Sequence, residues 1–360
     1  MRRLLVKSGA GEYDVVVGRG AWKALRRLKE YTSVFVLTER VLWKRWGDEF
    51  TRDAGWSSPR PVFVPSGEKS KSLAMVERVA SALLERGADR RSLLVAFGGG
   101  VVGDLGGFVA STYMRGIDCI QVPTTVVAQV DSSIGGKTAV NIRAMKNLVG
   151  TFYPPRVVLA DPAVLATLSG RAFKSGLYEV IKHAILSGSS LFRLLESKVA
   201  GLEPGATSTL ETIVARAAQV KVDVVSSDER EGGLRRVLNL GHTYGHALEE
   251  VTGYRRFLHG EAVAWGMLLA MRLAERSGVL DLAAAKRMVN LVRAVGPLPP
   301  IRDIAVERIL RFLPRDKKAV GGRIHWVLPE GVGKIRITPD VPESAIAGAF
   351  RDVQRGAWNA

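Results

Sequence analysis

Cysteine and long hydrophobic runs are scarce in this 360-residue chain, and each scarcity excludes a class of protein. The single cysteine, Cys119, cannot form an internal disulfide, and disulfide frameworks belong to secreted proteins. No apolar run approaches the roughly 18 residues that a transmembrane helix needs. The N-terminus is polar and strand-like and lacks the apolar core of a secretion signal. We therefore expect a cytoplasmic protein that does not bind membranes.

Acidic side chains are also few: 35 Asp and Glu stand against 52 Lys and Arg, a net charge of +17. Such an excess is typical of nucleic-acid-binding proteins. The arginines, however, are spread along the chain in pairs such as Arg90-Arg91 and Arg255-Arg256, with no basic run that contains interleaved aromatics. This pattern favours a solvated surface that attracts anionic metabolites, and nucleic-acid binding is the weaker alternative.

The length exceeds what one hydrophobic core usually supports, so we expect two domains. The first, 1–168, alternates strand-like runs with a helical stretch at 72–87, which indicates a Rossmann-like α/β domain with a parallel sheet. The strand-like runs are 34–39, 61–65, 92–99, 118–125 and 156–161. The sequence contains no internal repeat and no low-complexity linker.

The second domain, 169–360, is predicted to be mainly α-helical, because its apolar residues recur at helical spacing. The helical stretches are 176–188, 208–227, 242–251, 260–278 and 281–296, and a strand pair is predicted at 323–329 and 333–339. The cleft between two domains is the usual place for a ligand, so we expect the active site there.

Histidine is rare, yet three of the five histidines lie close together at His242, His246 and His259. Histidine is the side chain most used for metal ligation and for proton transfer near neutral pH. His242 and His246 are four residues apart, on one face of a helix, so spacing alone suggests that both bind a metal. The cluster marks the predicted active site.

A glycine-rich stretch follows the strand that ends near residue 97. Gly98, Gly100 and Gly103 precede an apolar helix, an arrangement that lets a pyrophosphate approach the backbone and the helix N-terminus. The acidic residue expected about 20 positions later in a dinucleotide-binding motif is missing, so a tight turn is the alternative. A second glycine-bearing polar segment at 65–72 follows the preceding strand, and this favours nucleotide binding.

Polar residues are dense in the otherwise apolar segment 122–155. Lysines there, such as Lys137 and Lys146, are costly to bury unless an anion meets them. A solvated loop is one interpretation. The small residues nearby, and the lack of an acidic partner except Asp131, favour a phosphate or carboxylate ligand.

Several segments in order resemble the 3-dehydroquinate synthase family, from about Gly67 to about Lys318. They include GGGVVGDLGGFVAS, QVPTTVVAQVDSSIGGKTAVN, KNLVGTFYPP, EVIKHAIL, LNLGHTYGHALE and LHGEAVAWGM. The resemblance implies tightly held NAD and a divalent metal, usually zinc, with cobalt possible. It implies conversion of 3-deoxy-arabino-heptulosonate 7-phosphate into 3-dehydroquinate and phosphate, through oxidation, elimination, re-reduction, ring opening and aldol closure. It also implies a homodimer.

The resemblance further assigns roles to individual residues. Glu179, His242 and His259 become the metal ligands, and open positions remain, as a catalytic zinc site requires. His246 becomes a substrate and proton-transfer residue instead of a ligand. The catalytic residues implied are His246, Lys137, Asp131, Lys182 and Asn147.

The substrate and the cofactor receive larger sets by the same resemblance. The substrate carboxylate is expected to meet Lys221 and Arg235, and the hydroxyl side of the substrate is expected to meet Asp131, Lys146, Asn147 and Lys182. The phosphate is expected to meet Lys137, Asn239, Lys317, Lys318 and, from a second subunit, Arg115. The NAD-binding residues implied are Ser66, Gly67, Glu68, Lys69, Ser70, Lys71, Gly99, Gly100, Val101, Val102, Gly103, Asp104, Thr124, Thr125, Lys137, Lys146, Val164, Leu165, Ala166 and Thr167.

Two other enzyme classes share parts of this pattern. Cyclases that form inosose or valiolone rings keep NAD and metal but accept substrates without a carboxylate, and Lys221 with Arg235 argues against them. NAD-dependent dehydrogenases of the glycerol-phosphate or iron-dependent alcohol type release NADH, and the segments VDSSIGGK and KNLVG argue against these. His183 and His325 are expected to be structural.

Overall fold

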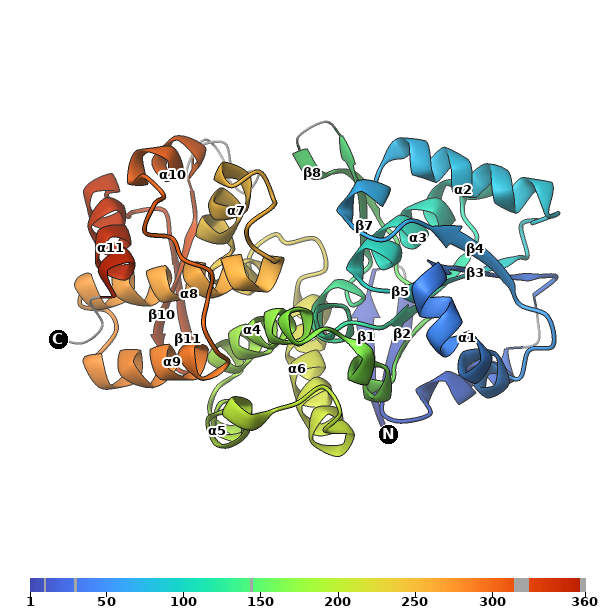
Figure 1. Ribbon diagram of the computed structural model, residues 1–360, viewed down its shortest axis with the longest axis horizontal. Helices are drawn as coiled ribbons and strands as arrows, with labels where there is room; N and C mark the ends of the chain where they lie inside the picture. Colours follow the sequence, from blue (N-terminus) through green and yellow to red (C-terminus); the bar gives the residue numbers. More distant parts are fainter. Residues whose placement is uncertain (10, 29–30, 143–144, 314–323, 357–360) are drawn as a thin grey trace. The chain divides into compact units, whose positions relative to one another are not determined.

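The computed structural model describes residues 1–360 except 10, 29–30, 143–144, 314–323 and 357–360 (Figure 1). The described chain divides into two compact units. The first contains Met1–Leu168 and Pro204–Glu229, and the second contains Ser169–Glu203 and Arg230–Ala360.

A seven-stranded sheet forms the centre of the first unit, counted over its described residues, in the order β1-β2-β9-β6-β5-β3-β4. Its strands are β1 Arg2–Ser8, β2 Gly11–Val17, β3 Val34–Glu39, β4 Arg60–Val64, β5 Leu93–Gly98, β6 Asp118–Pro123 and β9 Val157–Ala160. Neighbouring strands are parallel, except that β1 runs antiparallel to β2. The predicted parallel sheet is confirmed, and β5 is buried along its whole length, as a central parallel strand should be.

Helices of the first unit pack on this sheet. They are α1 Arg40–Ala54, α2 Leu73–Glu85, α3 Gly100–Thr112 and α6 Thr207–Ser227, with short turns η1 Ala21–Arg27, η2 Glu68–Ser70, η3 Tyr113–Arg115, η4 Ala128–Ser132 and η5 Pro162–Thr167. Side chains of β3, β5 and α3 such as Phe35, Leu94 and Leu105 form the core between sheet and helices. Ser72 begins α2, because its hydroxyl accepts a hydrogen bond from the Met75 amide.

The polar segment after β6 is not a plain loop, because it contains the short helical element η4. Beyond η4 it forms a hairpin of β7 Lys137–Ile142 and β8 Met145–Phe152, which pair in antiparallel fashion. Gly150 fits here because a Cβ atom at this position would lie 2.1 Å from the Thr138 carbonyl oxygen. The glycines and polar residues hide the alternation that would have predicted these strands.

One helix differs from the predicted domain division. The expectation placed all of 169–360 in one helical domain, whereas contacts group Pro204–Glu229, which includes α6, with the first unit. The reason is packing, because α6 contacts β1 and η4. Glu211 on α6 also forms an ion pair with the amino group of Met1, with 2.7 Å between the nitrogen and Oε1. Its helical period was predicted correctly, but periodicity does not tell which core a helix joins.

The second unit is mainly helical, as predicted. Its helices are α4 Gly170–Ser187, α5 Ser189–Lys198, α7 His242–Val251, α8 His259–Arg276, α9 Leu282–Ala294, α10 Val306–Phe312 and α11 Glu343–Arg355, with turns η6 Val199–Gly201 and η7 Leu234–Asn239. The hairpin of β10 Trp326–Gly331 and β11 Lys334–Thr338 is confirmed. Over the residues described, none of the helices is long and apolar enough to cross a membrane.

Helix α8 lies at the centre of the second unit, where it contacts α4, α7, α9, α11 and β10 (Figure 1). Glycines let its neighbours come close. A Cβ atom at Gly266 would lie 1.8 Å from the Gly241 carbonyl oxygen, and one at Gly260 would lie 1.8 Å from the Ser175 carbonyl oxygen. These helices therefore touch backbone to backbone, which no larger residue would permit.

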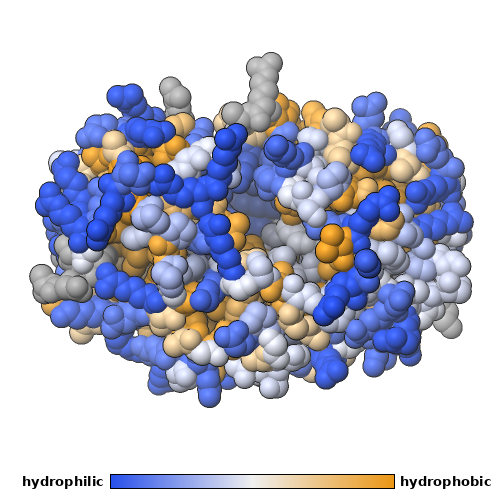
Figure 2. Space-filling view, viewed as in Figure 1, coloured by the Kyte–Doolittle hydropathy of each residue, from blue (hydrophilic) through white to orange (hydrophobic). Residues whose placement is uncertain are grey.

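Hydrophilic side chains are spread widely over the face of the molecule that Figure 2 shows. Figure 2 shows hydrophilic side chains over the visible face of each unit, with hydrophobic side chains among them. This distribution agrees with the expectation of a solvated surface.

Replacing Gly266 with alanine should destabilise the second unit, because the new methyl group would collide with the backbone of Gly241. We expect a loss of about 3 kcal/mol or more, which corresponds to about 6–12 °C in Tm. Thermal unfolding followed by circular dichroism measures this. Gly170→Ala in α4 is the matched control, since nothing lies within 4 Å of its Cβ position. An unchanged Tm for Gly266→Ala would contradict the backbone contact.

Candidate metal centre and cofactor residues

Three side chains from three helices of the second unit converge on one point. Glu179 lies in the middle of α4, and His242 and His259 are the first residues of α7 and α8. Nε2 of His259 lies 3.4 Å from Oε1 of Glu179, and Nε2 of His242 lies 3.8 Å from the same oxygen. The three ligand atoms all lie within 4.8 Å of one another.

These separations fit a metal ion. Donor atoms about 2.1 Å from a zinc ion in tetrahedral geometry lie about 3.4 Å apart, close to the two distances measured here. Glu179 is fully buried, and among the described residues its oxygens accept no well-oriented hydrogen bond. A buried carboxylate is costly without a cation nearby; Lys182 supplies one at Oε2, and a divalent metal with open positions would supply another between Oε1 and the two imidazoles.

The second nitrogen of each imidazole is also held. Nδ1 of His242 lies 3.2 Å from the Leu240 carbonyl oxygen, and Nδ1 of His259 lies 3.4 Å from Oε2 of Glu249. Both partners accept hydrogen bonds, so Nδ1 carries the proton and Nε2 presents its lone pair toward Glu179. Glu249 was not predicted as a site residue, although its position three residues after His246, on the same side of α7, was a usable signal.

Charged neighbours surround the centre. Nζ of Lys182, a fully buried residue one turn after Glu179, lies 2.5 Å from Oε2 of Glu179. Burial lowers the pKa of His259, but its hydrogen bond to Glu249 and the charges of Glu249 and Glu179 raise it more, so the net pKa lies above 6.5. A proton therefore competes with a metal ion for His259, and metal binding should strengthen as the pH rises.

His246 lies beside the three donors. Its ring centroid is 5.6 Å from that of His242 and 6.1 Å from that of His259. With Glu249 and His259 it forms a second set of residues whose ligand atoms lie within 4.8 Å of one another, whereas Glu179, His242 and His259 form the first. The geometry therefore differs from the inference by spacing alone, in which His242 and His246 bind the same ion. His183, expected to pack, is fully buried.

In the first unit, the glycine-rich stretch begins α3, with Gly99 at the N-cap. A Cβ atom at Gly99 would lie 3.0 Å from the Thr125 methyl group, and one at Gly100 would lie 3.1 Å from Oγ of Ser132. The first amide groups of a helix have no partner within it. The α3 N-terminus thus combines these amides with the hydroxyls of two neighbouring side chains, a combination suited to a phosphate.

A polar network joins several predicted NAD-binding and catalytic residues of the first unit. Lys71 is buried and forms an ion pair with Asp104 and a hydrogen bond to Oδ1 of Asn147. Asn141 donates to Glu68 over 2.8 Å and accepts a 2.8 Å hydrogen bond from the Asn147 amide. Burial raises the pKa of Asp104, which the charge of Lys71 partly offsets. The network ties η2, α3 and the β7–β8 hairpin together.

Asp131 and Lys221, which the sequence places 90 residues apart, meet in the first unit. Asp131 lies on η4 and Lys221 is a buried residue of α6, and the two form an ion pair. The contact explains why a lysine can be buried on that helix.

The remaining predicted residues have varied settings. Arg235 on η7 is only 2% exposed, and Asn239 donates a 2.8 Å hydrogen bond to Glu231. Lys137 is exposed on β7, and Arg115 is exposed with a φ of 67°, a strained value for arginine. In the segment before α2, the exposed residues are Ser66, Gly67 and Lys69, and Ser70 is buried. The turn η5 contains Val164, Leu165, Ala166 and Thr167. Thr167 accepts a 3.1 Å hydrogen bond from the Trp46 indole. Lys317 and Lys318 lie outside the described residues.

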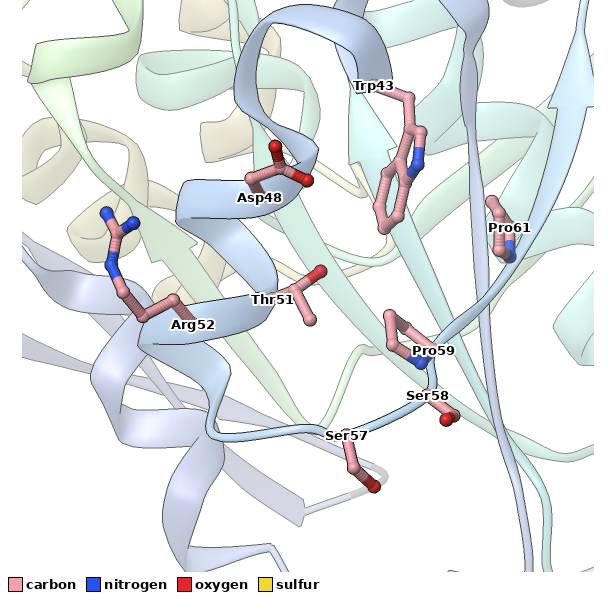
Figure 3. Close-up of a pocket in the computed structure, with 8 residues that line it drawn as sticks. All are labelled: Trp43, Asp48, Thr51, Arg52, Ser57, Ser58, Pro59 and Pro61. Atoms are coloured by element: carbon pink, nitrogen blue, oxygen red, sulfur yellow. The ribbon is translucent and has the colours of Figure 1, made fainter.

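An open hollow on the first unit lies beside α1 and the segment that follows it, and none of the predicted site residues lines it (Figure 3). Trp43, Thr51 and Pro59 are among its lining residues. The eight residues that line it include one acid, Asp48, and one arginine, Arg52, and contain no histidine, lysine or cysteine, so we do not consider it a candidate active site.

Solved structures define the class of protein to which this fold and centre correspond. The 2-epi-5-epi-valiolone synthase from Streptomyces hygroscopicus, solved with NAD+ and Zn2+ bound, has a TM-score of 0.87 and 28% identity, covering 96% of this chain and 97% of that one. A 2-deoxy-scyllo-inosose synthase complexed with carbaglucose-6-phosphate, NAD+ and Co2+ also has a TM-score of 0.87, with 26% identity, covering 98% of this chain and 99% of that one. The fold is that of these two synthases, which were solved with NAD+ and with Zn2+ or Co2+ bound.

Sequence comparison specifies the family. The 3-dehydroquinate synthase N-terminal pattern matches residues 61–175, and the 3-dehydroquinate synthase C-terminal pattern matches residues 176–319. A 3-dehydroquinate synthase from Koribacter versatilis is 43% identical over 364 residues, which cover 98% of each chain. The chain belongs to the 3-dehydroquinate synthase family, and the predicted membership is confirmed.

Replacing His259 with alanine should remove one of three metal donors and abolish stoichiometric zinc binding. Metal content of the purified protein after desalting, measured by atomic emission, checks this. His325→Ala is the matched control, because His325 lies outside the cluster and should leave zinc content unchanged. Full zinc occupancy in the His259→Ala protein would place the ligands elsewhere.

Proposed function

We propose that this protein converts 3-deoxy-D-arabino-heptulosonate 7-phosphate into 3-dehydroquinate and phosphate, a step of the shikimate pathway toward chorismate and the aromatic amino acids. The observation that carries the proposal is the convergence of Glu179, His242 and His259 in a chain that matches 3-dehydroquinate synthases over nearly its whole length. The proposed enzyme is a carbon–oxygen lyase of the cytoplasm.

Two cofactors are proposed, NAD and a divalent metal, zinc or cobalt, held by Glu179, His242 and His259. When bound, they would supply a reversible hydride acceptor and a Lewis acid for the oxygen on carbon 5 of the substrate. The donor geometry of the second unit supports the metal. The α3 N-terminus, with Thr125 and Ser132 beside it, supports the placement of the NAD pyrophosphate in the first unit.

Arg235 and Lys221 are the proposed partners of the substrate carboxylate. Arg235 is 2% exposed, and a guanidinium so buried suits a bidentate anion. Lys221 forms an ion pair with Asp131, which is itself proposed to contact the substrate hydroxyls. The Lys221 ammonium group would therefore lie between Asp131 and the substrate carboxylate. Lys182, Lys146 and Asn147 are proposed for the same hydroxyl side.

The phosphate is proposed to bind Lys137, Asn239, Lys317, Lys318 and the partner subunit's Arg115, which makes the enzyme a homodimer. The exposed, strained backbone at Arg115 supports this role, because strain of this kind persists where a side chain must be aimed. His246 is proposed to move a proton at the substrate, since its ring lies 5.6 Å from that of His242 and it is not one of the three proposed metal donors.

The activity is tested by incubating the purified protein with heptulosonate phosphate, zinc and a catalytic amount of NAD. Phosphate and 3-dehydroquinate should appear in equal amounts, because the cofactor is regenerated in each turnover. A requirement for stoichiometric NAD would indicate a dehydrogenase instead. Turnover of a sugar phosphate that lacks the carboxylate, without turnover of the heptulosonate, would indicate an inosose- or valiolone-type cyclase.

Arg235→Ala should raise the KM for substrate strongly while zinc content stays unchanged, because it removes binding to the carboxylate. A hydrogen-bonded ion pair of this kind is worth about 2–5 kcal/mol when one partner is truncated, or about 30-fold or more in kcat/KM. Arg236→Ala is the matched control, since Arg236 is the adjacent and less buried arginine on the same turn. Equal KM values for the two variants would refute the role of Arg235.

A further inference from the structure

Three residues on one face of α4 contact three consecutive residues at the start of α8. Arg171, Ser175 and Glu179 are spaced by four residues and therefore lie on one side of the helix. Arg171 contacts Glu261, Ser175 accepts a 3.1 Å hydrogen bond from the Gly260 amide, and Glu179 faces His259. Residues 261, 260 and 259 of α8 therefore contact successive turns of α4 at residues 171, 175 and 179. The last of these contacts joins two of the proposed metal donors.

The contact farthest from the metal donors is the most elaborate of the three. Nε and Nη2 of Arg171 donate to the two oxygens of Glu261 over 2.7 and 2.8 Å, and Nη2 also donates to the Arg256 carbonyl oxygen over 2.7 Å. Glu261 accepts a further 2.8 Å hydrogen bond from the Leu258 amide, so it caps the first turn of α8. One carboxylate thus fixes the start of α8 both to its own backbone and to α4.

We infer that Arg171 and Glu261 are positioning residues that set the metal affinity of the centre, although neither touches the metal donors. The inference rests on the proposed metal site. His259 lies two residues before Glu261, at the first position of α8. Any movement of this helix start moves the His259 imidazole relative to Glu179, and a metal site tolerates displacements of only about 0.5 Å.

Packing leaves the helix start one direction in which to move. Gly260 already touches the Ser175 carbonyl oxygen so closely that a Cβ atom would lie 1.8 Å from it, so α8 cannot move closer to α4 here. The Glu261 side chain is only 8% exposed. If Arg171 is removed, the Glu261 carboxylate stays buried but loses the guanidinium group that balances its charge. Loss of the pair should therefore let the start of α8 move away from α4 and separate His259 from Glu179.

The test measures zinc dissociation constants of the full-length protein by competition with a chromophoric chelator, for Arg171→Met and Glu261→Gln. We expect zinc binding about 10-fold weaker in each, the lower end of the range for residues that orient metal ligands. Glu261→Gln keeps an oxygen for the Leu258 amide, so it removes the ion pair with little loss of the cap. The visible spectrum of the Co2+-loaded protein should change in both variants, which loss of stability alone would not cause.

Arg287→Met is the matched control, because Arg287 forms an equally bidentate pair with Glu196 in the same unit, away from the metal donors. It should bind zinc like the unmodified protein, and Arg171→Lys should recover part of the affinity. Zinc affinities of Arg171→Met and Glu261→Gln within about twofold of the unmodified protein would overturn the inference. Failure of the unmodified protein to bind zinc would refute the proposed function instead, so the two failures are distinguishable.

Discussion

The close backbone approach of α8 to α4 and α7 is the constraint on which the candidate metal centre depends. The glycines at 241, 260 and 266 bring main chain within touching distance of main chain. Only then do the donors of three different helices come within 4.8 Å of one another. Gly241 and Gly260, which flank His242 and His259 in the sequence, and Gly266 are therefore part of the site, because the spacing of the three donors is set by how far apart the helix backbones lie.

Close packing also explains why charged residues in this region are buried at little cost. Lys182 meets Glu179 and Arg171 meets Glu261 as opposite charges, and the buried carboxylate of Glu249 lies 3.4 Å from Nδ1 of His259. The first unit uses the same solution on its own elements, where Lys71 meets Asp104 and Asn147. In both units a buried lysine or carboxylate lies where an ion or a phosphate-bearing ligand is expected. The residues that offset the electrostatic cost of burying these charges thus lie beside the proposed binding sites for the metal and for the cofactor.

The parts of the fold that could be predicted from sequence are those with a local cause. The strand at 93–98 is an unbroken apolar run, and the helices of the second unit repeat apolar residues at helical spacing. The helix at 207–227 was recognised, but its membership of the first unit depends on contacts with β1, which no local pattern records. Glu249 and Glu261 were missed for a related reason, since a glutamate in an amphipathic helix has the pattern of a solvent-facing residue until its partner is known.

The histidine cluster shows how spacing can point to a site without giving its membership. Residues four apart share a helix face, which makes His242 and His246 equivalent by pattern. They are not equivalent in space, because His242 begins α7, has its Nδ1 held by the Leu240 carbonyl and turns Nε2 toward Glu179. His246, one turn later, has a ring nitrogen within 4.8 Å of a carboxylate oxygen of Glu249 instead. Which histidine can bind a metal with Glu179 is therefore decided by the hydrogen bond to its second nitrogen and by the position of α4, and a helical repeat specifies neither.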